Sequence, residues 1–302
     1  MTARLRDALL STRDLLLTVG PFVALGLALL ALAYWALDPT PPRRMVLATG
    51  PAQGAYAEFA PRYVQALRRH GIQVELRATE GSAENLRLLR AGEVDAAFVQ
   101  AGNAPIDPPE EDEDDPMDGL ASLGSLFLEP VWIFYREAAA QERLKRPAAA
   151  TLAALSGWRV NVGTVGSGVP RLVGRLLDAN GLPRDAFELS HSAPTPAVVG
   201  LLAGELDALV FAQAPESPLV QMLLRTPGVA LLDLAQAEAY ARRVPSVSPV
   251  RLPRGVVDLA QDLPPADVHL VAPTAMLLVR EDTHPALQQL LVESLRSIRF
   301  LE

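Results

Sequence analysis

The sequence contains no cysteine among its 302 residues. A disulfide scaffold, a thiolate zinc site and a cysteine nucleophile are therefore excluded. Histidine is nearly as scarce, and the four that occur form neither a His-x-His pair nor an HExxH motif. We therefore expect no metal site and no catalytic residues. The four histidines, which stand far apart, are His70, His191, His269 and His284.

An excess of basic residues is also missing. The chain has 27 Lys and Arg against 35 Asp and Glu, and its net charge is −8. Eight of the acids lie in residues 107–118 (DPPEEDEDDPMD), so the rest of the chain is neutral. No basic stripe points to nucleic acid. We interpret the acidic run as a solvated, disordered loop, because the spacing and central glycine of an EF-hand calcium loop are absent.

Charge is absent from residues 15–37, a run of 23 mostly apolar residues. A helix of that length spans roughly 34 Å, enough to cross a bilayer. Interfacial aromatics, Tyr34 and Trp35, stand near its end, and three arginines precede it, which favours a cytoplasmic N-terminus. The arginines are Arg4, Arg6 and Arg13.

We therefore expect a cytoplasmic segment at 1–14, a transmembrane helix at 15–37 and a proline-rich linker at 38–44. The chain would be a single-pass protein of the cell inner membrane, with its binding domain in the periplasm. A cleavable signal peptide is the alternative, since Ala31-Leu32-Ala33 fits the small-x-small cleavage pattern. Both alternatives export residue 45 onward.

The exported part alternates short apolar runs with helical patterns, which predicts an α/β fold with largely parallel sheets. One pattern occurs twice: residues 88–98 read LLRAGEVDAAF and residues 201–210 read LLAGELDALV. Both contain A-G-E-[V/L]-D-A, 112 residues apart, where a helix ends at glycine and a buried strand follows. Gln100 and Gln213 follow the two copies at nearly matching points, and we count both among the candidate ligand-binding residues.

The repeated pattern predicts two similar lobes. We expect lobe 1 at 45–134, with the acidic loop inside it, and lobe 2 at 135–268. Residues 269–302 would form a hinge strand and a C-terminal helix that return to lobe 1. The chain would leave the first lobe near residues 129–132. A cleft between two α/β lobes is a favoured position for a ligand.

Three glycine-bearing junctions between strand and helix are candidate anion sites: residues 50–56, 79–82 and 163–168. Amide N–H groups at a helix N-terminus attract carboxylate or phosphate, although any α/β protein needs turns at such points. No cofactor fingerprint fits, because Arg171 stands where a dinucleotide motif needs glycine and Val165 where a nucleophile elbow needs it. We therefore expect no cofactor. Tyr56, just after the first loop, either walls the cleft or belongs to the core.

These residues resemble the TAXI family of receptors, the solute-binding subunits of TRAP transporters. The resemblance covers nearly all of 45–300, and its segments stand in the family's order and spacing. They are ATGPAQGAYAEFA (48–60), TEGSAENLRLLRAGEVDAAFVQ (79–100), GTVGSGVPRLV (163–173), LLAGELDALVFAQAPESPLV (201–220) and LVAPTAMLLVRED (270–282).

The resemblance implies a type II periplasmic-binding fold that captures a small organic anion, a dicarboxylate or an acidic amino acid, by hinge closure for a TRAP-type membrane permease. It implies ligand contacts at Gly54, Tyr56 and Ser82, and at Gly166, Ser167 and Gly168. The sequence departs from the family at Val169, Pro51 and Gln53, which leaves the identity of the ligand open. A tethered sensory or scaffold module and an extracytoplasmic enzyme on the same fold are the alternatives.

Overall fold

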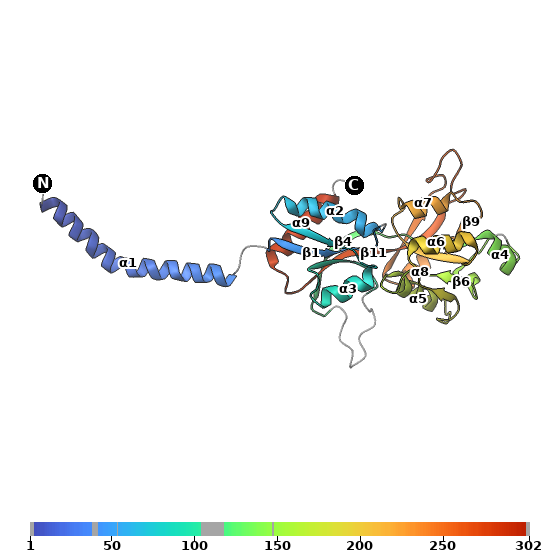
Figure 1. Ribbon diagram of the computed structural model, residues 1–302, viewed down its shortest axis with the longest axis horizontal. Helices are drawn as coiled ribbons and strands as arrows, with labels where there is room; N and C mark the ends of the chain where they lie inside the picture. Colours follow the sequence, from blue (N-terminus) through green and yellow to red (C-terminus); the bar gives the residue numbers. More distant parts are fainter. Residues whose placement is uncertain (1–2, 38–41, 53, 104–117, 147, 300–302) are drawn as a thin grey trace. The chain divides into compact units, whose positions relative to one another are not determined.

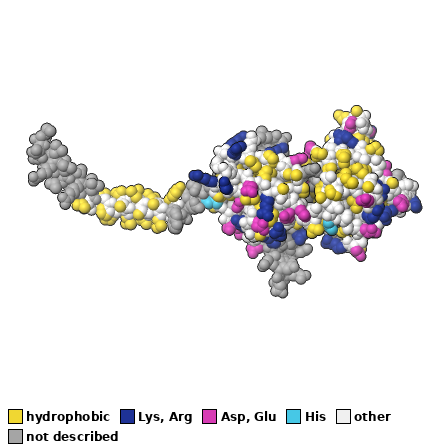
Figure 2. Space-filling model, in the orientation of Figure 1, with side chains coloured by type: hydrophobic (Ala, Val, Ile, Leu, Met, Phe, Trp, Pro, Cys, Tyr) yellow, Lys and Arg dark blue, Asp and Glu magenta, His cyan; other side chains and the backbone are white. Residues whose placement is uncertain are grey.

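The computed structural model describes residues 3–37, 42–52, 54–103, 118–146 and 148–299. Its N-terminal part is a single helix, α1 (Ala3–Leu37), and hydrophobic side chains cover the described surface of that helix (Figure 2). The stretch Leu17–Tyr34 has a mean hydropathy of 2.0 and is long enough to cross a membrane. A signal sequence near an N-terminus has the same length and composition.

The remainder of the chain has two lobes, each built on a sheet with helices on both faces (Figure 1). The first sheet has the strand order β10-β11-β3-β1-β2, with β4 also paired to β11. Its edge strand β10 pairs with residues 268–273 of β11 and packs in the cores of the second lobe. Its strands are β1 (Arg44–Ala48), β2 (Gln73–Arg77), β3 (Ala96–Gln100), β4 (Leu120–Leu128), β10 (Val247–Leu252) and β11 (Val268–Arg280). The helices of this lobe are α2 (Ala55–Arg68), α3 (Ser82–Arg90) and α9 (Pro285–Arg299).

The second sheet has the order β7-β6-β8-β5-β9. Its strands are β5 (Val131–Arg136), β6 (Arg159–Asn161), β7 (Glu188–Ser190), β8 (Ala208–Ala212) and β9 (Val229–Leu231). The helices of this lobe are α4 (Glu137–Leu144), the 3-10 turn η1 (Leu152–Leu155), α5 (Val169–Ala179), α6 (Pro194–Ala203), α7 (Pro218–Leu224) and α8 (Ala237–Arg243).

Strand β5 shows why the central strands read as continuous apolar runs. Its odd-numbered residues, such as Ile133 and Tyr135, pack in the core beneath α5 and α8. Its even-numbered residues, Trp132 and Phe134, pack in the opposite core with α6 and α7. Side chains alternate between the faces of a strand, so a strand covered by helices on both faces must be apolar at every position.

The repeated pattern of the sequence is realised as the same structure in both lobes. Gly92 and Gly204 follow α3 and α6 with φ of +68° and +81°, a backbone conformation in which glycine is favoured. Three residues later, Asp95 accepts a hydrogen bond from the backbone N–H of Val46 on β1 (2.7 Å). Asp207 accepts the equivalent bond from Arg159 on β6 (3.0 Å). Each aspartate thus fixes a buried strand beside its parallel neighbour.

The two lobes also share one strand order, β2-β1-β3-β11 in the first and β7-β6-β8-β5 in the second. In each lobe the fourth strand is antiparallel to the third and crosses from the other lobe. The predicted two-lobed fold is therefore confirmed. The boundary expected after residue 134 is wrong, because all of β5 pairs with β8 and β9 of the second lobe.

Strand β4 is absent from our sequence-based expectations. It has partly exposed residues and carries Gly124, at φ +139°, so it lacks the alternation that marks a strand. It pairs with β11 through two register shifts. A Cβ at position 124 would lie 3.1 Å from Leu295 of α9, so glycine lets this helix approach the sheet.

The two connections between the lobes are bonded to each other. The N–H of Glu129, between β4 and β5, donates to the carbonyl of Pro273 in the middle of β11 (2.9 Å). The N–H of Ala101, just after β3, donates to the carbonyl of Thr274, which follows Pro273 in β11 (2.7 Å). The expected crossings therefore lie side by side, as a hinge requires. Most of the acidic run, the residues 38–41 of the linker, and Gln53 lie outside the described residues.

Candidate functional site: the cleft between the lobes

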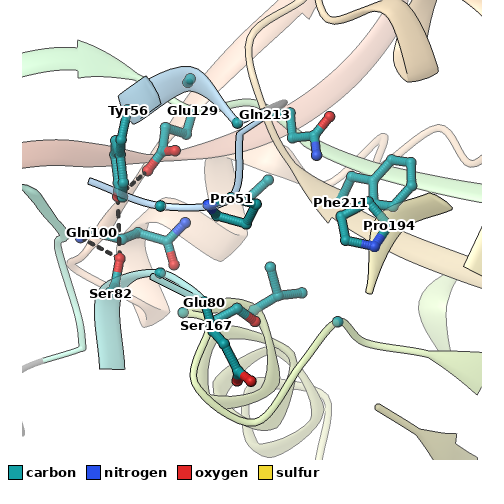
Figure 3. A pocket seen from close by; sticks show the side chains of 18 of the residues that line it. Pro51, Tyr56, Glu80, Ser82, Gln100, Glu129, Ser167, Pro194, Phe211 and Gln213 are labelled. Carbon is teal, nitrogen blue, oxygen red and sulfur yellow. Dashed lines mark hydrogen bonds between the residues drawn. The ribbon is translucent and has the colours of Figure 1, made fainter. Parts of the chain in front are cut away.

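A cavity of about 80 Å³ lies between the two lobes (Figure 3). A single water needs about 10–15 Å³ of such space, so the cavity has room for a small molecule. Its walls come from the loops after β1, β2 and β6, from the starts of α2, α3, α5 and α6, and from the ends of β3 and β8. The site thus lies at the carboxyl ends of parallel strands, where ligands of open α/β sheets bind.

Buried Asn85 of α3 holds the loops of the first lobe in place. Its Nδ2 donates to the carbonyl of Thr49 at the end of β1 and to that of Phe98 on β3, the second at 2.7 Å. Its Oδ1 accepts from Oγ1 of Thr79 in the TEGS loop (2.6 Å). One side chain therefore fixes three segments that frame the cavity.

Asn161 does the same for the second lobe at the end of β6. It is fully buried, and its Oδ1 accepts from the N–H of Gly163 (3.0 Å), which sets the turn of the GTVGSG loop. Its Nδ2 donates to the carbonyl and Oγ of Ser190 at the end of β7 (3.3 and 3.2 Å). The glycine-rich loop is thus tied to the neighbouring strand.

A chain of hydrogen bonds runs along the first-lobe wall of the cavity (Figure 3). The backbone N–H of Gln100 donates to Oγ of Ser82 (2.9 Å), which lies 3.1 Å from the hydroxyl of Tyr56. That hydroxyl donates to Oε2 of Glu129 (2.7 Å). The N-cap of α3 is Gly81, and the hydroxyl of Ser82, the first residue of the helix, takes part in this chain of hydrogen bonds.

Glu129 is the carboxyl group at the end of this chain, and it is 4% exposed. Burial raises its pKa to about 7, although hydrogen bonds from Tyr56 and the side chain of Gln100 partly oppose the rise. Burial and the nearby Glu129 charge also raise the pKa of Tyr56 well above its ordinary value. The phenol therefore stays protonated and donates to the carboxylate.

The charges of the cavity wall are all of one sign. Among the described residues that line it, two are acidic, Glu129 and Glu80, and none is Lys, Arg or His. The small organic anion expected from the sequence therefore meets no cationic side chain on this wall. Backbone N–H groups at the starts of α2, α3 and α5 remain as donors for an anionic group.

The second-lobe wall is largely apolar and carries one amide. Phe211 and Pro194 form its surface, and Gln213 lies beside them at 6% exposure. Oε1 of Gln213 accepts from Oγ of Ser217 (2.7 Å), while Figure 3 shows its amide nitrogen turned toward the cavity. The carbonyl of Gln213 accepts from the indole of Trp132 on the crossing strand β5 (2.9 Å). Gln213 thus connects the site to the hinge.

The two lobes touch at the TEGS and GTVGSG loops. The N–H of Gly166 donates to Oε2 of Glu80 (2.9 Å), and the carbonyl of Gly166 accepts from the N–H of Glu84 (3.0 Å). A Cβ at Gly166 would lie 2.5 Å from the same Oε2, and one at Gly81 would lie 3.2 Å from the Cα of Ser167. Glycine is therefore needed for this approach.

Seven of the eight candidate residues from the sequence line this one cavity, and Gly166 is the exception. Gly166 contributes to the contact between the lobes rather than to the cavity wall. Tyr56 both packs in the aromatic core, 5.6 Å from the ring of Phe98, and presents its hydroxyl to the site. The seven are Gly54, Tyr56, Ser82, Gln100, Ser167, Gly168 and Gln213.

Sequence reasoning missed Glu129 as a residue of the site and placed it only near the hinge. A signal was available, since a glutamate that directly precedes the buried strand VWIFY is expected to be buried with it. Glu80 and Asn85 were also missed as site residues, because a charged or amide side chain in a loop or helix start is usually exposed.

The comparisons with known proteins agree with this architecture. A family model described as the NMT1-like family matches residues 47–296. A protein from Bordetella bronchiseptica RB50 is similar over 84% of this chain and 70% of its own, with a TM-score of 0.55 and 14% identity.

Two ligand-bound structures are similar as well. The alkanesulfonate-binding protein SsuA from Xanthomonas axonopodis pv. citri, bound to MOPS, is similar over 85% of this chain and 73% of its own (TM-score 0.53, 16% identity). Tv2483 bound to L-arginine is similar over 85% of this chain and 86% of its own (TM-score 0.52, 12% identity). At such identities the likeness shows a shared fold.

Proposed function

Because this chain belongs to the NMT1-like family, we propose that it is a receptor that binds one small solute between its two lobes. The observation that carries the proposal is the cavity itself, which both lobes wall and which collects seven of the residues expected from the sequence. The ligands of SsuA and Tv2483, MOPS and L-arginine, are small molecules bound by proteins of the same fold, and this supports the proposal.

Binding would proceed by hinge closure. The crossing strands β5 and β11 connect the lobes, and the bond between Glu129 N–H and the Pro273 carbonyl joins them at the hinge. The contact of Gly166 with Glu80 would form as the lobes close over the solute. Polar groups on both walls would then contact the solute at once, which favours the closed arrangement only when the site is filled.

We propose that the protein acts without catalysis. Oγ of Ser167 donates to the carbonyl of Thr164 (2.7 Å), so the one serine of the GTVGSG loop is engaged by its own turn. Burial raises the pKa of Glu129 to about 7, but this carboxyl group is already bonded to Tyr56. An enzyme on this scaffold would turn over its solute, whereas a receptor returns it unchanged.

The finer assignment is a TAXI-type receptor that delivers its solute to a TRAP-type permease. It is supported by the five sequence segments that resemble that family. We propose that α1 stays in the inner membrane as an anchor and that the lobes face the periplasm. A carboxylate of the solute, as in a dicarboxylate or an acidic amino acid, would accept from the amides at the helix starts. A tethered sensory module is the alternative.

The direct test is binding by the full-length chain purified in detergent. A thermal-shift screen of small organic acids, amino acids, amines and sugars should give a stabilising solute, because a ligand that binds only the folded state raises its melting temperature. Calorimetry with that solute should give one binding site per chain. The solute recovered from the protein afterwards should be chemically unchanged. If no compound of the screen raises the melting temperature, the result would contradict the receptor. Chemical turnover of a compound would favour the enzyme.

The choice between transport and sensing needs a cellular measurement. Deletion of the gene should abolish uptake of the bound solute if the receptor serves a permease. Unchanged uptake together with a lost transcriptional or behavioural response would instead support the sensory module.

A further inference from the structure

Glu129 lines the cavity, and none of the described residues that line it with Glu129 is Lys, Arg or His. Burial and hydrogen bonds to Tyr56 and Gln100 are the influences that act on its carboxyl group, and no basic side chain is among them. One other acid of the described residues is as deeply buried, and its surroundings differ. Asp207, at 2% exposure, is paired with Arg136, Arg143 and Arg159.

This contrast matters because a buried charge is costly unless it is paired and hydrogen-bonded. Asp207 meets that condition within its own lobe. Glu129 does not, although its carboxylate faces a cavity that another molecule can enter. The missing partner would therefore be supplied from outside the chain.

The carboxylate also has room for further donors. Its two oxygens can accept about four hydrogen bonds. Tyr56 and the side chain of Gln100 take up two of these, with the phenol at 2.7 Å from Oε2. Gln213 on the opposite wall turns an amide nitrogen toward the same space, and the structure gives that nitrogen no partner among the residues that it describes. The cavity thus offers a buried carboxylate that can accept further hydrogen bonds and a buried side-chain amide that can donate one.

We propose that the solute carries an ammonium group and that Glu129 is the residue that binds it. The inference rests on the proposed receptor function and narrows the class of its solute. The amides at the starts of α2, α3 and α5, and the side chain of Gln213, remain for an oxygen of the same molecule. An organic anion without an amine would place negative charge beside Glu129 and Glu80 with no cationic side chain on the wall to offset it.

Glu80 is a weaker anchor for the ammonium. It is exposed at the contact between the lobes, and its Oε2 already accepts from the N–H of Gly166 (2.9 Å). Water screens an exposed carboxylate, so its attraction for a cation is small. Glu129, buried and bonded only to neutral donors, is the carboxylate that discriminates between solutes.

The experiment compares pairs of solutes that differ in an amine, using calorimetry on the full-length chain in detergent. Suitable pairs are L-glutamate with glutarate, L-alanine with propionate, and putrescine with butanediol. The best-binding amine of the thermal-shift screen is tested with its own deaminated counterpart. The variant is Glu129→Gln, which keeps an oxygen that can accept from Tyr56. The matched control is Glu75→Gln, the same change at an exposed glutamate of β2 outside the cavity wall.

We expect the amine of a pair to bind and its counterpart to bind at least about tenfold more weakly. Glu129→Gln should weaken the amine about 10- to 100-fold, the range for losing a hydrogen bond to a charged group. Glu75→Gln should leave the affinity unchanged. A circular dichroism melt of both variants shows that they fold.

Two other results are distinguishable. Binding of the deaminated member as tightly as the amine, or an amine affinity that survives in Glu129→Gln, overturns the ammonium inference and leaves the receptor standing. Silence of the wild-type chain toward every solute overturns the receptor and this inference with it.

Discussion

The hydroxyl of Tyr56 donates a 2.7 Å hydrogen bond to Oε2 of Glu129, and this bond joins the start of α2 to the segment that leaves the first lobe. Both residues are buried, and both line the cavity. The bond therefore connects the solute site to the hinge. We therefore expect a change in the charge of Glu129 to affect both the solute site and the hinge.

The first prediction concerns the pH dependence of stability. Burial holds the pKa of Glu129 at about 7 in the folded chain, against an ordinary value of 4.5. The folded state thus binds a proton more tightly than the unfolded state. The resulting stability is fully present below pH 4.5 and is lost as the pH rises through about 7. The difference corresponds to about 3 kcal/mol.

Glu129→Gln removes this loss, so at pH 8 the variant should melt several degrees above the wild type, at about 2–4 °C per kcal/mol. At pH 4 the two chains should melt together. The side chains that bond to the carboxyl are those of Tyr56 and Gln100, and Glu80 is the other acid among the described residues of the cavity wall. A constant difference in melting temperature between pH 4 and pH 8 would show that Glu129 does not titrate as described.

The second prediction isolates the bond that opens this Discussion. The hydrogen bond from Tyr56 lowers the pKa of Glu129, in opposition to burial. Tyr56→Phe removes the donor and keeps the ring in the aromatic core, so the carboxyl should titrate at a still higher pH. Carboxyl carbon NMR of the glutamates, with Glu129→Gln to assign the signal, measures the midpoint. A midpoint that falls in Tyr56→Phe would be the contrary result.

The third prediction concerns the contact between the lobes. A Cβ at Gly168 would lie 2.5 Å from Oε1 of Gln100 and would also meet the side chain of Asn103. Gly168→Ala should therefore separate the lobes without straining its own backbone, which has φ of −80°. The amides of Glu84 and Gly166, which bond across the contact, should then exchange with deuterium faster.

Hydrogen–deuterium exchange read by mass spectrometry measures this effect without any ligand. Val165→Ala is the control, since Val165 belongs to the same loop but is 73% exposed and does not line the cavity. Equal protection of the two amides in Gly168→Ala and in the wild type would show that the contact does not depend on a bare backbone.

The fourth prediction compares the two copies of the repeated pattern. Asp95 and Asp207 each hold the N–H of a neighbouring strand, but Asp207 also binds three partly exposed arginines. Asp95→Asn should cost about 1 kcal/mol, the value of a single hydrogen bond. Asp207→Asn should cost about 2–4 kcal/mol, because it leaves the arginines without their partner. Urea unfolding of both variants gives the comparison.

The stabilising contribution of Asp207 should also depend on pH in the acid range. Burial would raise the pKa of Asp207, but hydrogen bonds from Arg159 and the charge of Arg143 lower it to about 2 from 3.8. Its contribution is therefore present above pH 3.8 and is lost as the pH falls toward 2. The gap in stability between wild type and Asp207→Asn should narrow over that range. A gap that stays constant down to pH 2 would contradict the assignment.

Much of this architecture could be predicted from the sequence, because it depends on local patterns. The repeat A-G-E-[V/L]-D-A encodes a helix end, a turn and a buried strand, and it placed Gln100 and Gln213 on opposite walls of one cavity. The long apolar run of β11 and the aromatic run of β5 identified the two crossings. Glycine-bearing junctions marked the loops that meet.

The remaining features depend on contacts between distant residues. Strand β4 is held by register-shifted pairing with β11, which no local period reveals. The hydroxyl of Ser82 could cap its own helix, and only its proximity to Tyr56 gives it a different partner. From the sequence alone, Glu129 is predicted only to lie near the hinge, because its contact with Tyr56 of α2 forms only in the folded chain. The charges of the described residues on the cavity wall therefore could not be predicted from the sequence.

The most direct test of the receptor uses the absence of cysteine. Glu75→Cys and Glu188→Cys, on the exposed edge strands β2 and β7, place one spin label on each lobe of an otherwise unlabelled chain. Pulsed electron paramagnetic resonance measures the distance between them. We predict that a saturating solute shifts the distances to one narrow population. An unchanged distribution with a solute that calorimetry shows to be bound would contradict closure of the two lobes around it.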